Sequence, residues 1–183
     1  LRLEWAKADD ARDFGCTISE QLTVDRDIPY CSETDNSADH MLDVYCPLEF
    51  QHLPIILNIH GGAWFYGDKE RYRFYAAHLA ENGFLVVNCN YRRMPDAFYP
   101  APLEDVCAVV KWMQTQNYTD NPNWFMVGDS AGAQLVTQYC ILASNPEYRM
   151  KLGFPDIDAL PNAIALNCGI YDMRSLAVSY THL

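Results

Sequence analysis

The sequence predicts a single α/β domain, with a mostly parallel sheet covered by helices on both faces. Four short, nearly continuous apolar runs occur after residue 53, and segments with helical character separate them. Such runs suit strands that are buried on both faces of a parallel sheet. Regular alternation of strand and helix is the second sign of this architecture. The 183 residues, half of them hydrophobic, are enough to bury one core, so we expect one domain over residues 1–183.

The strands follow from the spacing of apolar residues. Residues 1–20 are predicted to form a helix without strong caps. The next two elements, 22–28 and 41–46, alternate apolar and polar residues as half-buried strands do, and a polar turn over 32–39 separates them. The buried strands are expected at 54–59, 84–89, 123–127 and 162–168.

Three helices are expected between these strands. Residues 69–82 follow Asp68, a good N-cap, and end before Gly83, where a left-handed turn is favoured. Residues 102–116 place Pro102 and acidic residues in the first turn, which suits the positive end of a helix. Residues 131–144 are mostly apolar and predict a well-buried helix.

The motif Gly-Asp-Ser-Ala-Gly at 128–132 lies between a predicted strand and a predicted helix. A serine on a sharp strand-to-helix turn projects its hydroxyl above the sheet, and the flanking glycines allow neighbouring backbone to approach. The following helix directs its positive N-terminus at the same point. Ser130 is therefore the predicted nucleophile of a serine hydrolase.

A second motif, His-Gly-Gly-Ala-Trp at 60–64, follows the first buried strand. Glycines let such a loop aim its amide N–H groups at an oxyanion, and losing one donor typically costs about 3–4 kcal/mol. The amide of Ala131, directly after the nucleophile, is the expected partner donor. His60 is expected to order the loop rather than act as the base, and Trp64 is expected either to line the acyl pocket or to pack in the core.

These two motifs and the stretch 91–106 together resemble the hormone-sensitive-lipase-like branch of the α/β-hydrolase esterases. The likeness covers about residues 40–172 and implies an α/β-hydrolase fold. It also implies an oxyanion hole formed by the amides of Gly61, Gly62 and Ala131. Residues 60–69 are similar to kynurenine formamidases and feruloyl-esterase-like relatives as well, so an amide or aryl-ester substrate stays open.

In that family the catalytic acid and histidine follow the nucleophile, beyond the last two strands. Only one further strand is predicted after Ser130, so we expect the chain to be a C-terminally truncated piece, with residues 162–168 as an exposed apolar edge. Within the chain, Asp172, which follows the last predicted strand, is a candidate for the acid, and His182 is a candidate for the base, although it lies in an ending typical of truncated reading frames. The sequence also lacks an initiator Met, so the true start is open.

Other titratable residues are expected to have structural roles. Asp129 adjoins Ser130, but its side chain should leave the turn in another direction. Glu104 and Asp105 fit a helix N-terminus better than a glycosidase pair. Surface or capping positions are expected for the three remaining histidines, His40, His52 and His78.

Composition limits the partners. The net charge of −11 repels nucleic acid and anionic membranes, and no apolar stretch reaches the length of a membrane span. The seven cysteines are dispersed along the chain and are predicted to be reduced thiols, which favours a cytoplasmic location. No metal-ligand cluster is evident.

The sequence thus predicts a cofactor-independent hydrolase of small carboxylic esters, with short acyl groups expected from the family. An amide hydrolase and a non-catalytic ligand-binding member of the same fold are the alternatives. The oligomeric state is left open.

Overall fold

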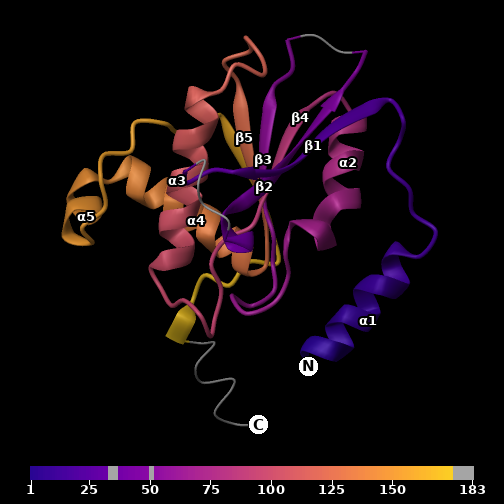
Figure 1. Ribbon diagram of the computed structural model, residues 1–183. Helices are drawn as coiled ribbons and strands as arrows, with labels where there is room; N and C mark the ends of the chain where they lie inside the picture. The colour runs from indigo at the N-terminus through magenta and orange to yellow at the C-terminus, as the bar shows by residue number, and fades with distance from the viewer. Residues whose placement is uncertain (33–36, 50–51, 175–183) are drawn as a thin grey trace.

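The computed structural model describes residues 1–32, 37–49 and 52–174. Its centre is a six-stranded sheet in the order β1-β2-β4-β3-β5-β6 (Figure 1). The two N-terminal strands pair antiparallel, and β3 to β6 run parallel. The strands are β1 (Leu22–Pro29), β2 (Met41–Pro47), β3 (Ile55–Ile59), β4 (Leu85–Cys89), β5 (Trp124–Asp129) and β6 (Ala163–Asn167). The predicted fold class and all six predicted strands are confirmed, while part of the predicted turn at 32–39 lies outside the described residues.

Helices cover both faces of this sheet (Figure 1). One face carries α2 (Arg73–Glu81), and the other carries α3 (Ala101–Thr115) and α4 (Ala131–Ser144). Side chains alternate between the two layers: on β3, Leu57 packs on the side of α3 and α4, and Ile56 on the side of α2. The remaining helices are α1 (Arg2–Asp13), α5 (Pro146–Lys151) and the 3₁₀ turns η1 (Ala38–His40) and η2 (Lys69–Tyr72).

The helix predicted over 69–82 begins as the 3₁₀ turn η2 and becomes α-helical only at Arg73. Asp68 caps it as expected, by accepting a hydrogen bond from the Arg71 amide at 2.9 Å. The backbone of Lys69 is held by two buried asparagines of the β4 end: its N–H donates to Asn90, and its carbonyl accepts from Asn88. These tertiary bonds fix the first turn to the sheet, which explains its tighter geometry.

Helix α5 was not predicted. Asn145 caps it by accepting a hydrogen bond from the Tyr148 amide at 3.0 Å, and Pro146 occupies its first turn. The pair Asn-Pro is a helix-start signal. The sequence did not predict this helix because it has only six residues, which are too few to show a helical spacing of apolar side chains.

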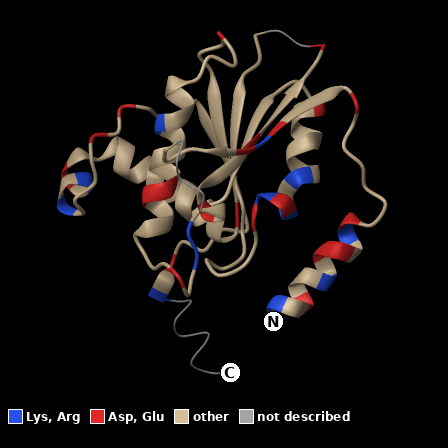
Figure 2. Cartoon of the chain, viewed as in Figure 1, with Lys and Arg blue, Asp and Glu red and all other residues tan. Residues whose placement is uncertain are grey.

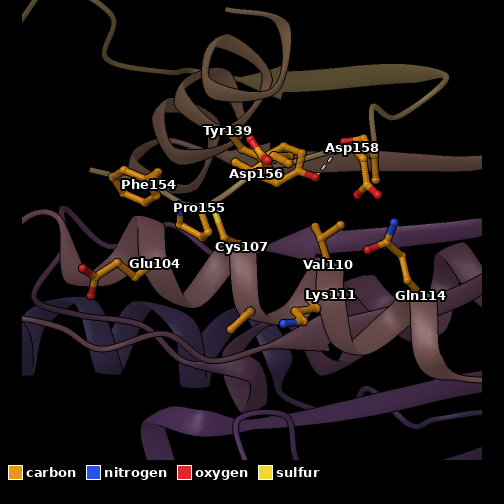
Figure 3. Close-up of a pocket in the computed structure, with 13 residues that line it drawn as sticks. Glu104, Cys107, Val110, Lys111, Gln114, Tyr139, Phe154, Pro155, Asp156 and Asp158 are labelled. Carbon is orange, nitrogen blue, oxygen red and sulfur yellow. Dashed lines mark hydrogen bonds between the residues drawn. The ribbon is translucent and has the colours of Figure 1, made fainter. Parts of the chain in front are cut away.

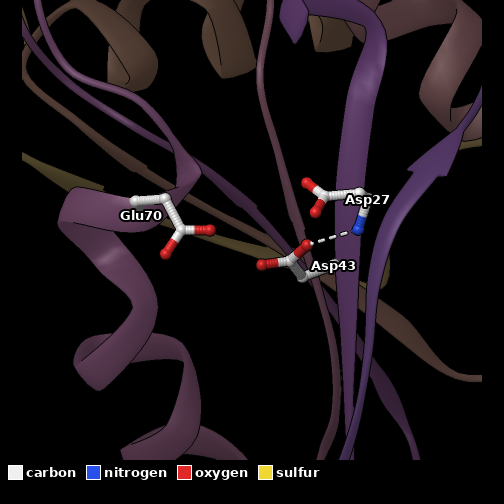
Figure 4. A group of neighbouring side chains, drawn as sticks. All are labelled: Asp27, Asp43 and Glu70. Carbon is white, nitrogen blue, oxygen red and sulfur yellow. Dashed lines mark hydrogen bonds between the residues drawn. The ribbon is translucent and has the colours of Figure 1, made fainter. Parts of the chain in front are cut away.

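A buried ammonium group ties η2 to the first two strands. Lys69 Nζ lies 2.8 Å from Asp27, 2.8 Å from Asp43 and 3.0 Å from Glu70. These three carboxylates lie close enough together to hold a cation (Figure 4). Burial alone lowers the pKa of Lys69, but the hydrogen bonds to the carboxylates raise it above its usual value. The charged lysine therefore occupies the position that a metal ion would need.

Strand β6 forms the edge of the sheet. It pairs with β5 on one side, and all five of its residues are exposed, including Ile164 and Leu166. The expectation of an exposed apolar edge at 162–168 is confirmed for this strand. Within the described residues, no helix is long and apolar enough to cross a membrane.

Candidate active site

The two motif loops meet at the carboxyl ends of neighbouring parallel strands. In the register of β3 and β5, Ile59 lies opposite Gly128, so the loop that begins at His60 lies beside the turn that holds Ser130. Open parallel sheets bind their ligands at this edge. The topology therefore brings together two segments that are almost seventy positions apart in the chain.

Ser130 has a backbone conformation that L-residues rarely adopt, with φ 50° and ψ −111°. Two hydrogen bonds hold it there: its N–H donates to the Asn167 carbonyl at 2.7 Å, and its carbonyl accepts from the Gln134 amide at 3.2 Å. Such strain costs on the order of 1–3 kcal/mol and persists only where the surroundings enforce it. Among the described residues, no group hydrogen-bonds the Ser130 hydroxyl.

The glycines of the turn are required by close backbone contacts. A Cβ at Gly128 would lie 2.6 Å from the Ala133 amide nitrogen, and one at Gly132 would lie 2.1 Å from the Ile59 carbonyl oxygen. Real Cβ atoms do not approach backbone so closely. The turn at 128–132 is thus packed directly onto the end of β3.

The backbone amides of the 60–64 loop differ in whether they donate a hydrogen bond to a protein acceptor. Gly61 N–H donates to the Tyr72 hydroxyl at 3.2 Å, and that hydroxyl donates to Asp129 at 2.6 Å. Burial, followed by the bond to Asp129, raises the pKa of Tyr72, so its phenol keeps the proton it donates. In the described part of the chain, no acceptor bonds the amides of Gly62, Ala63 or Ala131. Sequence reasoning did not single out the Ala63 amide, because the sequence does not reveal which of three consecutive amides lack an acceptor.

His60 is fully buried and stacks on Tyr91, with ring centroids 4.1 Å apart. Its Nδ1 bonds the Gly61 carbonyl at 2.7 Å, which requires the proton on Nδ1, and its Nε2 has no partner among the described residues. Burial lowers the pKa of His60 to about 4. The ring is therefore neutral and bonded to the loop backbone at neutral pH.

This burial predicts a pH-dependent loss of stability. Between pH 6.5 and about 4 the unfolded chain takes up a proton on His60 that the folded protein excludes. His60 therefore stabilises the fold above pH 6.5, and its contribution falls by about 2 kcal/mol from pH 7 to pH 5. Urea unfolding at the two pH values measures it. His60→Asn keeps a side-chain donor and should flatten this part of the profile, whereas an equal slope in both proteins would contradict the assignment.

A cavity of about 290 Å³ lies between Ser130 and helix α1. Figure 2 shows that α1 carries closely spaced charges of both signs. Trp5 of this helix stacks on Phe65 at 5.4 Å, and Asp9 accepts a hydrogen bond from Tyr66 at 2.6 Å. Helix α1 therefore forms one wall of the candidate site, which its weak sequence signal did not suggest.

Trp64 lies on the other side of the same loop. It packs against the main core cluster and also lines an apolar cavity of about 350 Å³. Trp64 therefore packs in the core, as one of the two alternatives expected, and it does not line the cavity that contains Ser130.

The remaining sequence candidates lie elsewhere. Asp129 faces Tyr72, as described above. Asp172 is exposed and accepts from the Arg174 amide, and His182 lies outside the described residues. Asp105 is buried in an ion pair with Arg92 rather than free at the helix end.

The other histidines lie beside carboxylates: His40 near Asp105, His52 near Asp120 and His78 near Glu81. His52 and His78 are exposed as expected, but His40 is mostly buried because it packs against Tyr30.

Comparisons with known proteins agree with this geometry. The chain is 39% identical over 90 residues to versiconal hemiacetal acetate esterase of Dothistroma septosporum, covering 47% of this chain and 27% of that protein. It is 27% identical over 156 residues to esterase LipQ of Mycobacterium tuberculosis, covering 81% of this chain and 36% of that protein. A crystal structure of esterase B from Lactobacillus rhamnosis, inhibited by a tributyrin phosphonate, superposes with a TM-score of 0.85 at 28% identity. That match covers 97% of this chain and 59% of the other.

The chain thus spans roughly a third of the length of these two curated relatives. The expected resemblance to α/β-hydrolase esterases is confirmed. The BD-FAE family model matches residues 42–177, well over half of the sequence. By this match and by its sheet topology, the chain belongs to the BD-FAE family and has the α/β-hydrolase fold.

Proposed function

We propose that this chain carries the nucleophile and oxyanion hole of a carboxylesterase. The observation that carries the proposal is the strained turn at Ser130, whose hydroxyl has no partner among the described residues and lies beside three unpaired amides. Strain of this kind clusters at functional sites. The esterase names of both relatives support the same activity.

In the proposed reaction, Ser130 Oγ adds to the ester carbonyl carbon as its proton passes to a base. The carbonyl oxygen becomes an oxyanion that accepts hydrogen bonds from Gly62, Ala63 and Ala131, at the positive end of α4. Collapse of this intermediate expels the alcohol and leaves an acyl-serine, and water then releases the acid. We assign Gly61 a positioning role instead of a place in the oxyanion hole, since its amide is bonded to Tyr72.

The base needs a separate proposal. The four described histidines either lie beside carboxylates or, for His60, are buried against Tyr91. We propose that the acid and the histidine of the triad come from sequence outside residues 1–174. The small share of each relative that this chain spans supports this proposal.

We further propose a short acyl group. The cavity beside Ser130 and α1 has about 290 Å³, at the lower end of the range for ligand pockets. Its walls include charged side chains such as Arg12 and Arg71, which do not favour a long alkyl chain. The acetate in the name of the Dothistroma relative agrees with this size.

The test uses the chain followed by the residues that continue it in its gene, with nitrophenyl acetate as substrate. We expect Ser130→Ala to lower kcat by about a millionfold, as loss of a triad serine does elsewhere. Ser144→Ala, at the far end of α4, is the matched control and should be neutral. Turnover that survives Ser130→Ala would overturn the nucleophile assignment. Ligand binding without turnover in the unmutated protein would favour the non-catalytic alternative.

A further inference from the structure

Two apolar cavities lie next to each other along one side of α4, with volumes of about 350 and 280 Å³. They share four lining residues, Tyr99, Gln134, Gln138 and Met173. Because two of these residues are one turn apart on α4, the cavities follow the helix axis. We treat them as one groove, the α4 groove.

The α4 groove starts one helical turn after Ser130, which is not itself one of the lining residues. Gln134, one of its shared residues, donates its amide N–H to the Ser130 carbonyl. Trp64, another lining residue of the groove, directly follows Ala63, which lines the cavity that contains Ser130. The short loop 62–64 therefore contributes to both spaces, with Gly62 and Ala63 lining one and Trp64 lining the other.

The two spaces differ in chemistry. The one beneath α1 is lined in part by Asp9, Arg12 and Arg71. The α4 groove near Ser130 is instead lined mainly by apolar side chains, including Trp64, Leu135 and Met94.

Within the described residues, the groove has exposed apolar side chains and one buried acceptor without a hydrogen-bond partner. Tyr99 and Met173 are each about half exposed, at 55% and 50%. Gln138 Oε1 is buried and has no hydrogen-bond partner among the described residues. Buried polar atoms are normally paired, so such an acceptor points to a ligand or an ordered water. Exposed apolar side chains gathered around one groove are the usual sign of a binding surface.

We propose that the α4 groove binds the alcohol part of the ester, and that this alcohol is apolar and about six to ten carbon atoms long. The proposal rests on the proposed function, because it needs the short acyl group on the α1 side of Ser130. A space of about 350 Å³ holds on the order of ten non-hydrogen atoms, if each takes roughly the volume of a water molecule. The polar substrate atoms remain at the amides, and the alkyl or aryl chain runs along α4.

Binding of amides to the Ser130→Ala variant tests this without catalysis. N-octylacetamide places its chain on the alcohol side, and its isomer N-methylnonanamide places it on the acyl side, with equal composition. Each fully buried methylene strengthens binding about fourfold, so in a half-open groove we expect the affinity to rise at least tenfold from N-butylacetamide to N-octylacetamide. We expect N-methylnonanamide to bind at least tenfold more weakly than its isomer. Calorimetric titration measures both.

A variant that fills the α4 groove with a larger side chain, together with a matched control, tests whether N-octylacetamide binds in this groove. Ala97 lines the α4 groove and Ala108 lines a cavity of about 480 Å³ between α3 and residues 154–159; both are half-buried. Figure 3 shows that second cavity, to which the loops of the candidate site contribute no lining residue. Ala97→Phe should weaken N-octylacetamide binding at least tenfold, and Ala108→Phe less than twofold. Met173→Asp, at an exposed position, should act like Ala97→Phe without disturbing the core.

The proposal would be overturned if the affinity for N-alkylacetamides did not depend on the length of the alkyl chain. It would also be overturned if neither Ala97→Phe nor Met173→Asp changed the affinity for N-octylacetamide. Tighter binding of N-methylnonanamide would overturn the assignment of the groove to the alcohol. These outcomes are separable from failure of the esterase proposal. Octyl-dependent binding persists if Ser130 is not a nucleophile, and Ser130-dependent hydrolysis of nitrophenyl acetate persists if the groove is unused.

Discussion

The 183-residue chain alone is expected to hydrolyse nitrophenyl acetate about a millionfold more slowly than the same chain completed by an acid and a histidine. A serine hydroxyl is a weak nucleophile unless a base accepts its proton. The described histidines face other partners, and the most deeply buried one, His60, bonds the loop backbone. Under the proposed function, the catalysis that remains comes from oxyanion stabilisation and binding, which leave about 10³–10⁴-fold catalysis over water in triad-deficient enzymes.

The measurement compares the chain with and without the residues that continue it. In the chain alone, Ser130→Ala should change the slow rate by less than about tenfold, because little of the remaining catalysis comes from the hydroxyl. Fast turnover by the chain alone that is lost in Ser130→Ala would contradict the expectation. It would place the base within these 183 residues, and alanine substitutions at Asp172 and His182 would then identify it.

The sequence predicted those parts of the site that depend on local geometry. The turn at 128–132 needs glycines at fixed offsets from the serine, and the structure shows why, in the backbone contacts of Gly128 and Gly132. Strand and helix lengths also follow from local patterns, so the strands were placed within one or two residues.

The features that sequence reasoning missed depend on contacts between distant segments. Tyr72 meets Gly61 and Asp129 only because the end of η2 lies close to the carboxyl ends of β3 and β5. The carboxylates around Lys69 come from three separate elements, and none of them forms a recognisable motif in the sequence. Likewise, no spacing rule indicates that Trp5 lies above the candidate site, because α1 has no buried face to give it a pattern.

The packing of the 128–132 turn on β3 leads to the largest expected effect on stability. We expect Gly132→Ala to lower the free energy of unfolding by about 3 kcal/mol, which for a domain of this size corresponds to a decrease in Tm of about 10 °C. The new Cβ would lie 2.1 Å from the Ile59 carbonyl oxygen and 2.6 Å from the His60 carbonyl oxygen. Both atoms belong to backbone, so no flexible side chain can move aside. Either the start of α4 or the 60–64 loop must shift.

Gly153→Ala provides the control that separates collision from backbone strain. Gly153 has φ +75° but no atom within 4 Å of the position of a Cβ, so its substitution should cost only about 1 kcal/mol. Thermal and urea unfolding of the two variants measure the difference. An equal loss of unfolding free energy in Gly132→Ala and Gly153→Ala would mean that the backbone at the contact with β3 shifts easily to accept the new Cβ. The larger loss at Gly132 would instead mean that one rigid contact supports both the strained serine and the loop that offers its amides. The proposed oxyanion site would then be formed by the fold itself, before any substrate binds.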